Sequence, residues 1–535
     1  MRICLISREF PPDTGWGGVG AYNFHTAKGL LKAGHDVEVI SLAAREISAS
    51  ESFEQNIDGI KVHRVVWQNN LEELNLFLIS APNSHFVLKS GTALWKKFIE
   101  IHNENPFDVV ETPEHLATAI FNSNSSVVPL LITLHTPHFK FVDQHMHEAT
   151  ESFDNLLISM FEKMSILQAD VVASPSHDLA HYVSEHTGLS EQKIEIVRNP
   201  VDTDIFKPEG DQALTTESTM ALFVGRLETR KGVHTLVEAI PLVLKAVPKL
   251  KFVLVGSDTN YGVNGGSVRT ELERTLKANS CLQSVSFISH VDLTDMPKIY
   301  RSADFCIIPS IYDNAPYTCI EALASGKPVI VSNAGGTKEY VEPGITGFVT
   351  EANNAQTLAN AIIDLSLDET KRIQFGSAAR IYAENYLNLD KFVKKKVDLY
   401  DRAIESHKTN REFRMYRLSA NKILGDTLNV MCSFDQMIFD VLSKQSTEFR
   451  LKHWARLVLK RPKLALAVTI LNLLNFGKLL GIKMENTNLY KKLRQSVLNK
   501  MPPPFENTRR YGQIEPVGRI IAKNIPEVQF TGNVK

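Results

Sequence analysis

Short apolar runs alternate with amphipathic segments along most of the chain. In the first 200 residues the runs are RICLIS, DVEVIS, FDVVE, PLLITLH and ADVVASP, and a helix is expected after the first of them, from about Ala21 to Ala33. The alternation begins again with MALFVG, KFVLVG, VSFIS, DFCIIP and PVIVS. Apolar strands separated by helical segments are typical of parallel α/β sheets. The pattern therefore predicts two α/β domains in tandem.

Breaks in this pattern suggest where the domains end. The segment NPVDTDIFKP, residues 199–208, interrupts both periodicities, so we expect one domain over residues 1–200 and a second, with closing helices, over 201–404. Residues 405–535 differ, because they show few strand signals and a helical apolar face at Met431, Phe434, Ile438 and Val441. They predict an appended, mainly helical module.

Composition places the chain among soluble globular proteins. It has 535 residues, 43% hydrophobic and 22% charged. The five cysteines are scattered without CxxC spacing, which favours neither a disulfide framework nor a zinc site and fits a reducing compartment. The first apolar run is too short for the apolar region of a signal peptide, so a cytoplasmic location is expected.

The net charge of −1 hides an asymmetry. Residues 405–535 carry 23 Lys and Arg against 10 Asp and Glu, or +13, which leaves 36 against 50, or −14, for residues 1–404. Residues 449–484 contain no acid, eight bases and the run LALAVTILNLLNF, which is shorter than the ~20 apolar residues of a spanning helix. We expect 449–484 to make a peripheral contact with the inner face of a membrane. A helix packed on the acidic body is the alternative, and nucleic acid is not expected because stacking aromatic residues are sparse.

The stretch GWGGVG, residues 15–20, matches the GxGxxG pattern of dinucleotide-binding proteins. A dinucleotide site needs its first glycine directly after the strand and an acid at the end of the second strand. Here seven residues separate the strand from Gly15, and DVEVISLAA ends without an acid. The remaining signal is Gly17 and Gly18 before a helix, where bare backbone N–H groups suit an anion. A flexible surface turn is the alternative.

Two further motifs favour an anionic ligand. Arg226 and Lys231 follow the strand ALFVG, at the strand end where parallel α/β sheets bind ligands, and two cations there can neutralise a diphosphate. In PSIYDNAPYTCIEALASGKPVIVS, Pro316 is expected to start a helix whose tip holds phosphate, with Asp313 in the loop before it and Glu321 one turn inside. A solvated charge pair and helix-capping acids are the alternatives.

These motifs together resemble the family 4 retaining glycosyltransferases, enzymes of the GT-B type with two Rossmann-like domains facing a cleft. The resemblance covers about residues 1–400 and rests on the double-glycine loop, GRLETRKG, LVG, PSIYDNAPYTCIEALASGKPVI and GGTKEYVEPGITGF. It implies transfer of a sugar from a nucleotide-diphosphate sugar to the hydroxyl of a glycan, glycolipid or small metabolite. The implied catalytic residues are Arg226, Lys231, His135 and Asp313, and the implied donor-binding residues are Gly17, Gly18, Glu321, Val291, Thr318 and Cys319.

The sequence departs from the family pattern at two places and leaves alternatives open. Asp313 stands where the family usually has Glu, and Ala315-Pro316 stands where Phe-Gly is frequent, which puts the donor sugar in doubt. No Asp-x-Asp follows a strand, so we expect no metal and no other cofactor. An epimerase of the same fold and a non-catalytic sugar-nucleotide-binding scaffold are the competing hypotheses.

The acceptor is the part of the reaction on which the sequence says least. In this family the first domain usually holds it, so Glu111, Glu114 and His115, at and after FDVVE, are the candidate wall of an acceptor site. A solvated loop is the alternative.

Overall fold

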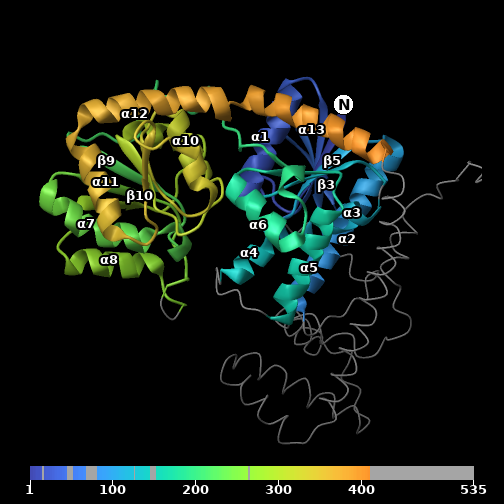
Figure 1. Ribbon diagram of the computed structural model, residues 1–535, viewed down its shortest axis with the longest axis horizontal. Coiled ribbons are helices and arrows are strands. Elements are labelled where there is room, and N and C mark those ends of the chain that lie inside the picture. Colours follow the sequence, from blue (N-terminus) through green and yellow to red (C-terminus); the bar gives the residue numbers. More distant parts are fainter. Residues whose placement is uncertain are drawn as a thin grey trace, which may run out of the picture.

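The computed structural model describes residues 1–14, 17–44, 52–67, 81–125, 127–144, 152–262 and 265–409. They form two α/β bodies side by side, each built on one sheet (Figure 1). The module predicted over 405–535 lies outside the described residues after Thr409, as does the whole basic segment 449–484. Within the described ranges, no helix is long and apolar enough to cross a membrane.

The first body has an eight-stranded sheet in the order β3-β4-β2-β1-β5-β6-β7-β8, parallel except for the β3–β4 pair. Its strands are β1 (Arg2–Ser7), β2 (Asp36–Leu42), β3 (Phe53–Ile57), β4 (Ile60–Val65), β5 (Val109–Pro113), β6 (Leu130–Thr133), β7 (Val171–Ser174) and β8 (Ile194–Ile196). Its helices are α1 (Gly18–Lys32), α2 (Pro82–Glu104), α3 (Ile120–Ser125), α4 (His138–Asp143), α5 (Phe153–Leu167) and α6 (His177–Thr187), with short turns η2 (His115–Ala117) and η4 (Glu191–Lys193).

The second body has a six-stranded parallel sheet in the order β11-β10-β9-β12-β13-β14. Its strands are β9 (Met220–Val224), β10 (Lys251–Val255), β11 (Val285–Ile288), β12 (Phe305–Ile308), β13 (Val329–Ser332) and β14 (Gly347–Thr350). Its helices are α7 (Val233–Ala246), α8 (Val268–Ala278), α9 (Met296–Ser302), α10 (Tyr317–Ala324), α11 (Ala355–Leu367) and α12 (Glu369–Tyr382), with η5 (Thr229–Lys231), η7 (Leu282–Ser284), η8 (Gly335–Tyr340) and η9 (Ala383–Leu387).

Both sheets are covered on their two faces, because successive side chains of a strand point to opposite faces and both sets are buried. In β1, Ile3 and Leu5 belong to one hydrophobic cluster, whereas Cys4 and Ile6 belong to the cluster on the other side. All four side chains are fully buried. A strand that is buried on both faces has a continuous apolar sequence, and the sequence analysis predicted these strands from such runs. The predicted two-domain α/β fold is confirmed.

The pattern missed the antiparallel hairpin of β3 and β4. Its turn is Asp58-Gly59, with positive φ angles of 52° and 86°. Asp-Gly is a preferred pair for the type I′ hairpin turn, which needs positive φ at both positions. The signal was therefore present in QNIDGIKV, between β3, which has no buried residue, and β4, which is mostly buried.

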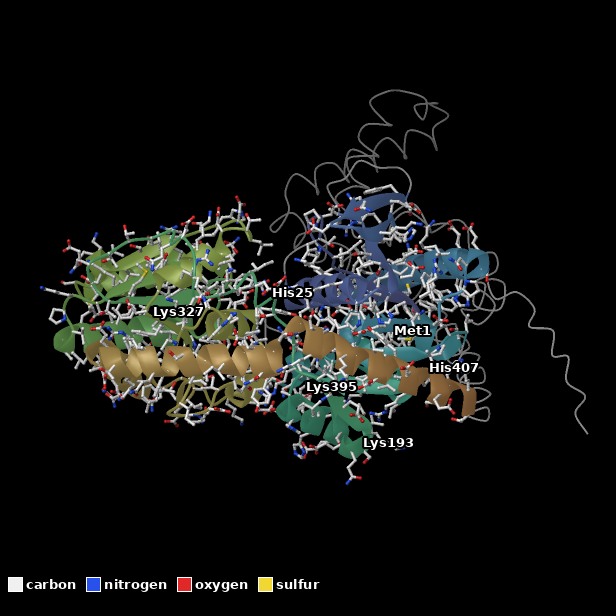
Figure 2. All side chains as sticks on the ribbon, turned by 90° about the horizontal axis from the view of Figure 1, so that it is seen from above. Met1, His25, Lys193, Lys327, Lys395 and His407 are labelled. Carbon is white, nitrogen blue, oxygen red and sulfur yellow. The ribbon has the colours of Figure 1, made fainter. Side chains whose placement is uncertain are left out.

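The last helix, α13 (Leu389–Thr409), returns to the first body. In Figures 1 and 2 the orange helices α12 and α13 run along both bodies. Phe392, Val393 and Tyr400 of α13 pack in the same cluster as Ile3 and Leu5 of β1. Residues 389–404, which the sequence analysis assigned to the second domain, therefore cover a face of the first sheet.

The two crossings between the bodies lie next to each other. The Val201 N–H donates to the Leu387 carbonyl at 2.8 Å, and the Asn388 side chain donates to Thr203 Oγ1 at 3.0 Å. His25 of α1 stacks on Tyr317 of α10 with ring centroids 5.5 Å apart, and Figure 2 shows His25 where the two bodies meet. The two bodies are thus joined at the crossings and between α1 and α10.

Candidate active site

The double-glycine loop leads directly into α1. Gly17 is the residue before the first turn, which contains no acidic side chain. A Cβ on Gly17 would lie 2.9 Å from Glu9 Oε2, whereas a Cβ on Gly18 would meet nothing within 4 Å. The start of α1 therefore combines bare backbone with the unpaired N–H groups of a first helical turn, which suit an anion.

Arg226 follows β9 and exposes about half of its side chain, with Nη2 3.4 Å from a Glu228 carboxylate oxygen. Its charge also acts on Glu9 of the first body, since burial raises the pKa of Glu9 and Arg226 opposes that rise. Because Glu9 also lies against Gly17, the structure brings Gly17 and Arg226 to the same region from different bodies. The sequence analysis did not identify Glu9.

Lys231 is paired with Asp313. Its Nζ lies 2.5 Å from Asp313 Oδ2, and Arg230 Nη1 lies 3.5 Å from the same oxygen. Burial acts to raise the pKa of Asp313, but the charges of Lys231 and Arg230 outweigh it and hold that pKa below its usual value. The sequence analysis missed Arg230, although its place beside Lys231 in ETRKG was a usable signal.

Gly232 makes this pairing possible. Its φ is +70°, and a Cβ there would lie 1.8 Å from the Pro309 carbonyl oxygen. Only glycine permits this close approach and this left-handed conformation. The Ile311 N–H also donates to the Arg230 carbonyl at 2.8 Å. The turn that carries Lys231 is thereby fixed against the loop that follows β12.

Helix α10 begins as predicted, with Pro316 before its first turn. Thr318 is half-buried, but the Cys319 side chain is fully buried in the core of the second body, and its N–H donates to the Pro316 carbonyl at 3.0 Å. Neither group of Cys319 is available to a donor, which corrects its assignment as a donor-binding residue. Thr318 retains access at the tip of the helix.

Glu321 lies one turn inside α10 and accepts a hydrogen bond from Tyr300 Oη at 2.8 Å. Burial raises the pKa of the Glu321 carboxyl to about 7, while the Tyr300 hydrogen bond acts in the opposite direction. The other carboxylate oxygen, Oε1, accepts no hydrogen bond from the residues that the structure describes, so it can accept one from a ligand hydroxyl.

Val291 lies three residues after β11 and lines a cavity of about 900 Å³. Ile299, His290, Asp292 and Lys298 contribute to the same cavity. The residue therefore lies in an open space that could receive a planar ring against an apolar side chain. Its position at the carboxyl end of the sheet is where parallel α/β sheets bind ligands.

His135 lies just after β6, and three groups surround it. Its N–H donates to Glu114 Oε1 at 2.8 Å, its carbonyl accepts from the Asn314 side chain, and its ring meets that of Tyr22 edge to face at 4.9 Å. Burial, and then the neighbouring His115, lower the pKa of His135 to about 3, so the ring is neutral. His135 Nε2 is buried and has no hydrogen-bond partner within the described part of the chain.

The three candidate acceptor residues occupy different environments. Glu111 lies inside β5, is 1% exposed, and pairs with Lys396 of α13 at 2.9 Å. It also accepts from Tyr22 at 2.9 Å and from Tyr400. These contacts correct its assignment, since Glu111 holds α13 on the sheet and lines no loop.

Glu114 and His115 do lie after β5, at the start of a strained turn in which Leu116 and Ala117 have φ near +50°. Glu114 is fully buried, and its carboxylate positions His135 by accepting a hydrogen bond from the His135 backbone N–H. His115 lines a cavity of about 260 Å³, and the other lining residues are Arg8, Glu9, Thr14, Leu42, Ala43, Ala44, Trp67, Phe86 and Leu116. His115 thus lies on the wall of a cavity, whereas Glu111 and Glu114 are fully buried.

Three basic side chains supply positive charge at the candidate site. Among the residues that the structure describes, no group of three or more His, Cys, Asp and Glu is arranged to hold a metal ion. Arg226, Arg230 and Lys231 supply positive charge at the carboxyl end of the second sheet. Such a cluster can stabilise a developing phosphate anion.

Two family profiles match the chain in tandem. The profile described as Glycosyltransferase Family 4 matches residues 16–205, and the one described as Glycosyl transferases group 1 matches residues 206–382. The chain is 26% identical over 395 residues to a glycogen synthase of Mycobacterium tuberculosis, covering 71% of this chain and 89% of the relative. It is 24% identical over 408 residues to a D-inositol 3-phosphate glycosyltransferase of Corynebacterium aurimucosum, covering 72% and 92%.

Solved structures share the fold. Sucrose-phosphate synthase from Thermosynechococcus elongatus superposes with a TM-score of 0.63 at 22% identity, covering 76% of this chain and all of that protein. HepE from Anabaena, solved in complex with UDP-glucose, gives a TM-score of 0.56 at 18% identity, covering 75% and 100%. Both likenesses leave about a quarter of this chain unmatched.

Proposed function

The chain belongs to the family 4, group 1 glycosyltransferases, and from this premise we propose that it moves a sugar from a nucleotide-diphosphate sugar to an acceptor hydroxyl with retention of configuration. Glycosyltransferase activity follows from the family. The donor class, the stereochemical course and the roles of individual residues are the content of the proposal.

The cations of the second body support the first step. Cleavage of a sugar–phosphate bond develops negative charge on the diphosphate and positive charge at the anomeric carbon. Arg226 and Lys231 would stabilise the departing diphosphate, together with the backbone N–H groups at Gly17 and Gly18. A positioned charge favours the transition state over the bound donor, because the charge of the leaving group is larger there.

The residues at and beyond α10 support a nucleotide-sugar donor. Glu321 would accept hydrogen bonds from ribose hydroxyls, Thr318 would lie at the diphosphate, and Val291 would contact the base in its cavity. HepE, which shares the fold, was solved with UDP-glucose, which makes a uridine nucleotide a reasonable first donor to test.

His135 and Asp313 would contact the transferred sugar. The neutral His135 ring has a buried Nε2 without a hydrogen-bond partner among the described residues, and this nitrogen can form one hydrogen bond with a sugar hydroxyl. Asp313, kept ionised by Lys231 and Arg230, can accept from a second hydroxyl. Retention would then proceed on one face of the sugar without a covalent enzyme intermediate, as the family implies.

The observation that carries the proposal is the contact between the two bodies at the candidate site. The loop of Asp313 in the second body and the loop of His135 in the first body are joined through Asn314. The test is a thermal-shift screen of purified protein against a panel of nucleotide sugars, followed by incubation of each hit with candidate acceptors. NMR of the product would report the anomeric configuration. An isomeric nucleotide sugar formed without acceptor would indicate an epimerase instead, and binding without any turnover would indicate a scaffold.

We also propose that the reaction requires no metal ion, because Arg226 and Lys231 supply the charge that a cation would otherwise supply. The proposal expects unchanged turnover in excess chelator. Loss of activity that added Mg²⁺ restores would overturn this part and leave the transferase proposal intact.

A further inference from the structure

Asn314 connects the two bodies at the centre of the candidate site. It lies directly after Asp313 in the second body and is 3% exposed. Its Nδ2 donates both to the His135 carbonyl and, at 2.8 Å, to Thr136 Oγ1 in the first body. The amide therefore bonds the segment that carries His135, while the preceding residue bonds Lys231.

The orientation of this amide is fixed. Tyr312 Oη donates to Asn314 Oδ1, so the oxygen is occupied and the nitrogen must face the first body. The two groups that face the nitrogen agree with this orientation. The His135 carbonyl and the Thr136 hydroxyl can both accept from an amide nitrogen, whereas the carbonyl could not donate to an amide oxygen.

The backbone beneath Asn314 is also rigid. The Asp313 carbonyl accepts from the Thr337 N–H at 3.3 Å and from Thr337 Oγ1 at 3.1 Å. A Cβ on Gly335 would lie 2.3 Å from that carbonyl oxygen, and a Cβ on Gly336 would lie 2.6 Å from the Asn314 carbonyl oxygen. The glycine pair thus permits a close approach that holds the loop and leaves Asn314 little freedom to move alone.

His135 is held from two sides as a result. Glu114 of the first body accepts from its N–H, and Asn314 of the second body donates to its carbonyl. The Glu114 contact, and a hydrogen bond that Thr136 Oγ1 donates to the same His135 carbonyl at 2.8 Å, exist within the first body, whereas the Asn314 contact exists only while the two bodies are together. The direction in which the His135 ring points is therefore coupled to contact between the bodies.

We propose that Asn314 is a positioning residue that aligns His135 with the Lys231–Asp313 pair when the two bodies close on the donor. The inference rests on the proposed function and extends it to a residue whose side-chain amide bonds Tyr312, His135 and Thr136. Binding of the nucleotide to the second body alone would not require Asn314, whereas sugar transfer would.

The test compares Asn314→Ala with wild type and with a matched control, Asn199→Ala. Asn199 is a second buried asparagine, 4% exposed, and it donates to the carbonyl of Ala315 in the same loop at 3.4 Å without contacting His135. Loss of two hydrogen bonds to the site is expected to lower kcat of Asn314→Ala by about 10-fold to 100-fold. The dissociation constant of the free nucleotide, measured by titration calorimetry, should change by less than about 3-fold.

Two further variants keep the test sharp. Asn314→Asp conserves the volume but replaces the donor with an acceptor against the His135 carbonyl, so it should lose kcat at least as strongly if Asn314→Ala folds poorly. Thr136→Val removes one of the two acceptors and also the hydrogen bond that Thr136 Oγ1 donates to the His135 carbonyl at 2.8 Å. Because the two side chains share one hydrogen bond, the double variant with Asn314→Ala should lose less kcat than the product of the two single losses.

The outcomes separate the inference from the proposed function. An active wild type with unchanged kcat in Asn314→Ala, or with kcat and nucleotide affinity lowered in equal proportion, overturns the positioning role. The same fall in kcat for Asn199→Ala also overturns it, since general damage to the loop would then explain the effect. A wild type that transfers no sugar from any donor contradicts the proposed function instead.

Discussion

Lys231 Nζ and Asp313 Oδ2 lie 2.5 Å apart and join two segments separated by 82 positions in the sequence. Both side chains are mostly buried, and Arg230 adds a second cation at 3.5 Å. The pair fixes the Lys231 ammonium beside the loop that leads into α10. Among the described residues, Asp313 is the carboxylate within ion-pair distance of the ammonium, so an approaching diphosphate can share it.

Replacing Lys231 by alanine should lower kcat far more than it weakens donor binding. Loss of a positioned charge-stabilising group commonly costs ~10²- to 10³-fold in rate. Steady-state kinetics beside nucleotide titration would separate the two effects. Lys245→Ala, an exposed lysine of α7, is the control for loss of a positive charge in the same body. Unchanged turnover in Lys231→Ala would remove this residue from the mechanism.

Arg226 and Arg230 should respond differently to substitution by alanine. Arg230 is largely buried and bonds Glu228 at 2.9 Å and the Tyr312 carbonyl at 3.2 Å, so its loss leaves a buried carboxylate without its nearer cation. Arg226 is about half exposed and reaches Glu228 only at 3.4 Å. We expect Arg230→Ala to lower the melting temperature and Arg226→Ala to lower kcat with little change in melting temperature. Equal melting temperatures for the two variants would refute this distinction.

Most of the fold could be predicted because its strands are buried on two faces. Continuous apolar runs such as KFVLVG have few other interpretations between helical segments. The hairpin of β3 and β4 was missed because β3 alternates partly buried and exposed residues and so contains no apolar run. The return of α13 to the first sheet could not be predicted, since the sequence of an amphipathic helix shows its apolar face but not the sheet that this face covers.

The candidate site was predictable where the chemistry depends on local order. Gly17 and Gly18 before α1, and Pro316 before α10, lie where the sequence placed them. Partners distant in sequence were not predictable: the pairing of Lys231 with Asp313, and of Glu111 with Lys396, depends on tertiary packing. Glu111 and Cys319 were predicted to contact substrates because the sequence shows which residue types are present. It does not show that both side chains are buried in contacts within the protein.

Donor affinity should fall as pH decreases through about 7. Glu321 has its pKa raised to about 7 by burial, and its protonated form has one acceptor fewer for a ribose hydroxyl. The donor KM should therefore rise between pH 8 and pH 6, and Glu321→Gln should have a raised KM that is flat over this range. A wild-type KM independent of pH, or the same slope in the glutamine variant, would contradict the assignment.

Glu114 should make the protein less stable as pH increases. Burial raises its pKa to about 8, whereas the unfolded chain has the ordinary value of 4.5. Between these values the native state holds a proton that the unfolded state has released, so stability present at low pH is lost as pH rises through about 8. In Glu114→Gln, whose amide can still accept from the His135 N–H, the melting temperature should fall less between about pH 5.5 and about pH 8 than in wild type. Exposed Glu369→Gln is the control, and parallel curves for Glu114→Gln and wild type would contradict the prediction.

The cavity beside His115 should bind the acceptor. Trp67 and Phe86 meet edge to face at 5.0 Å on its wall, and Arg8 lies over the Phe86 ring at 5.5 Å. An apolar aromatic wall with a few polar groups is typical of small-ligand sites, and Glu9 and His115 supply such groups here.

Trp67→Ala should therefore raise the acceptor KM by about 10-fold or more, because a large aromatic contact is lost, and should leave the donor KM unchanged. Tyr386→Ala removes an aromatic ring that is 63% exposed and far along the chain from this cavity, so it is the control for a general effect of losing an aromatic side chain. The measurement is bisubstrate kinetics with each substrate varied in turn. A rise in the donor KM with the acceptor KM unchanged would move the acceptor away from His115 and Trp67 to another surface of the first body.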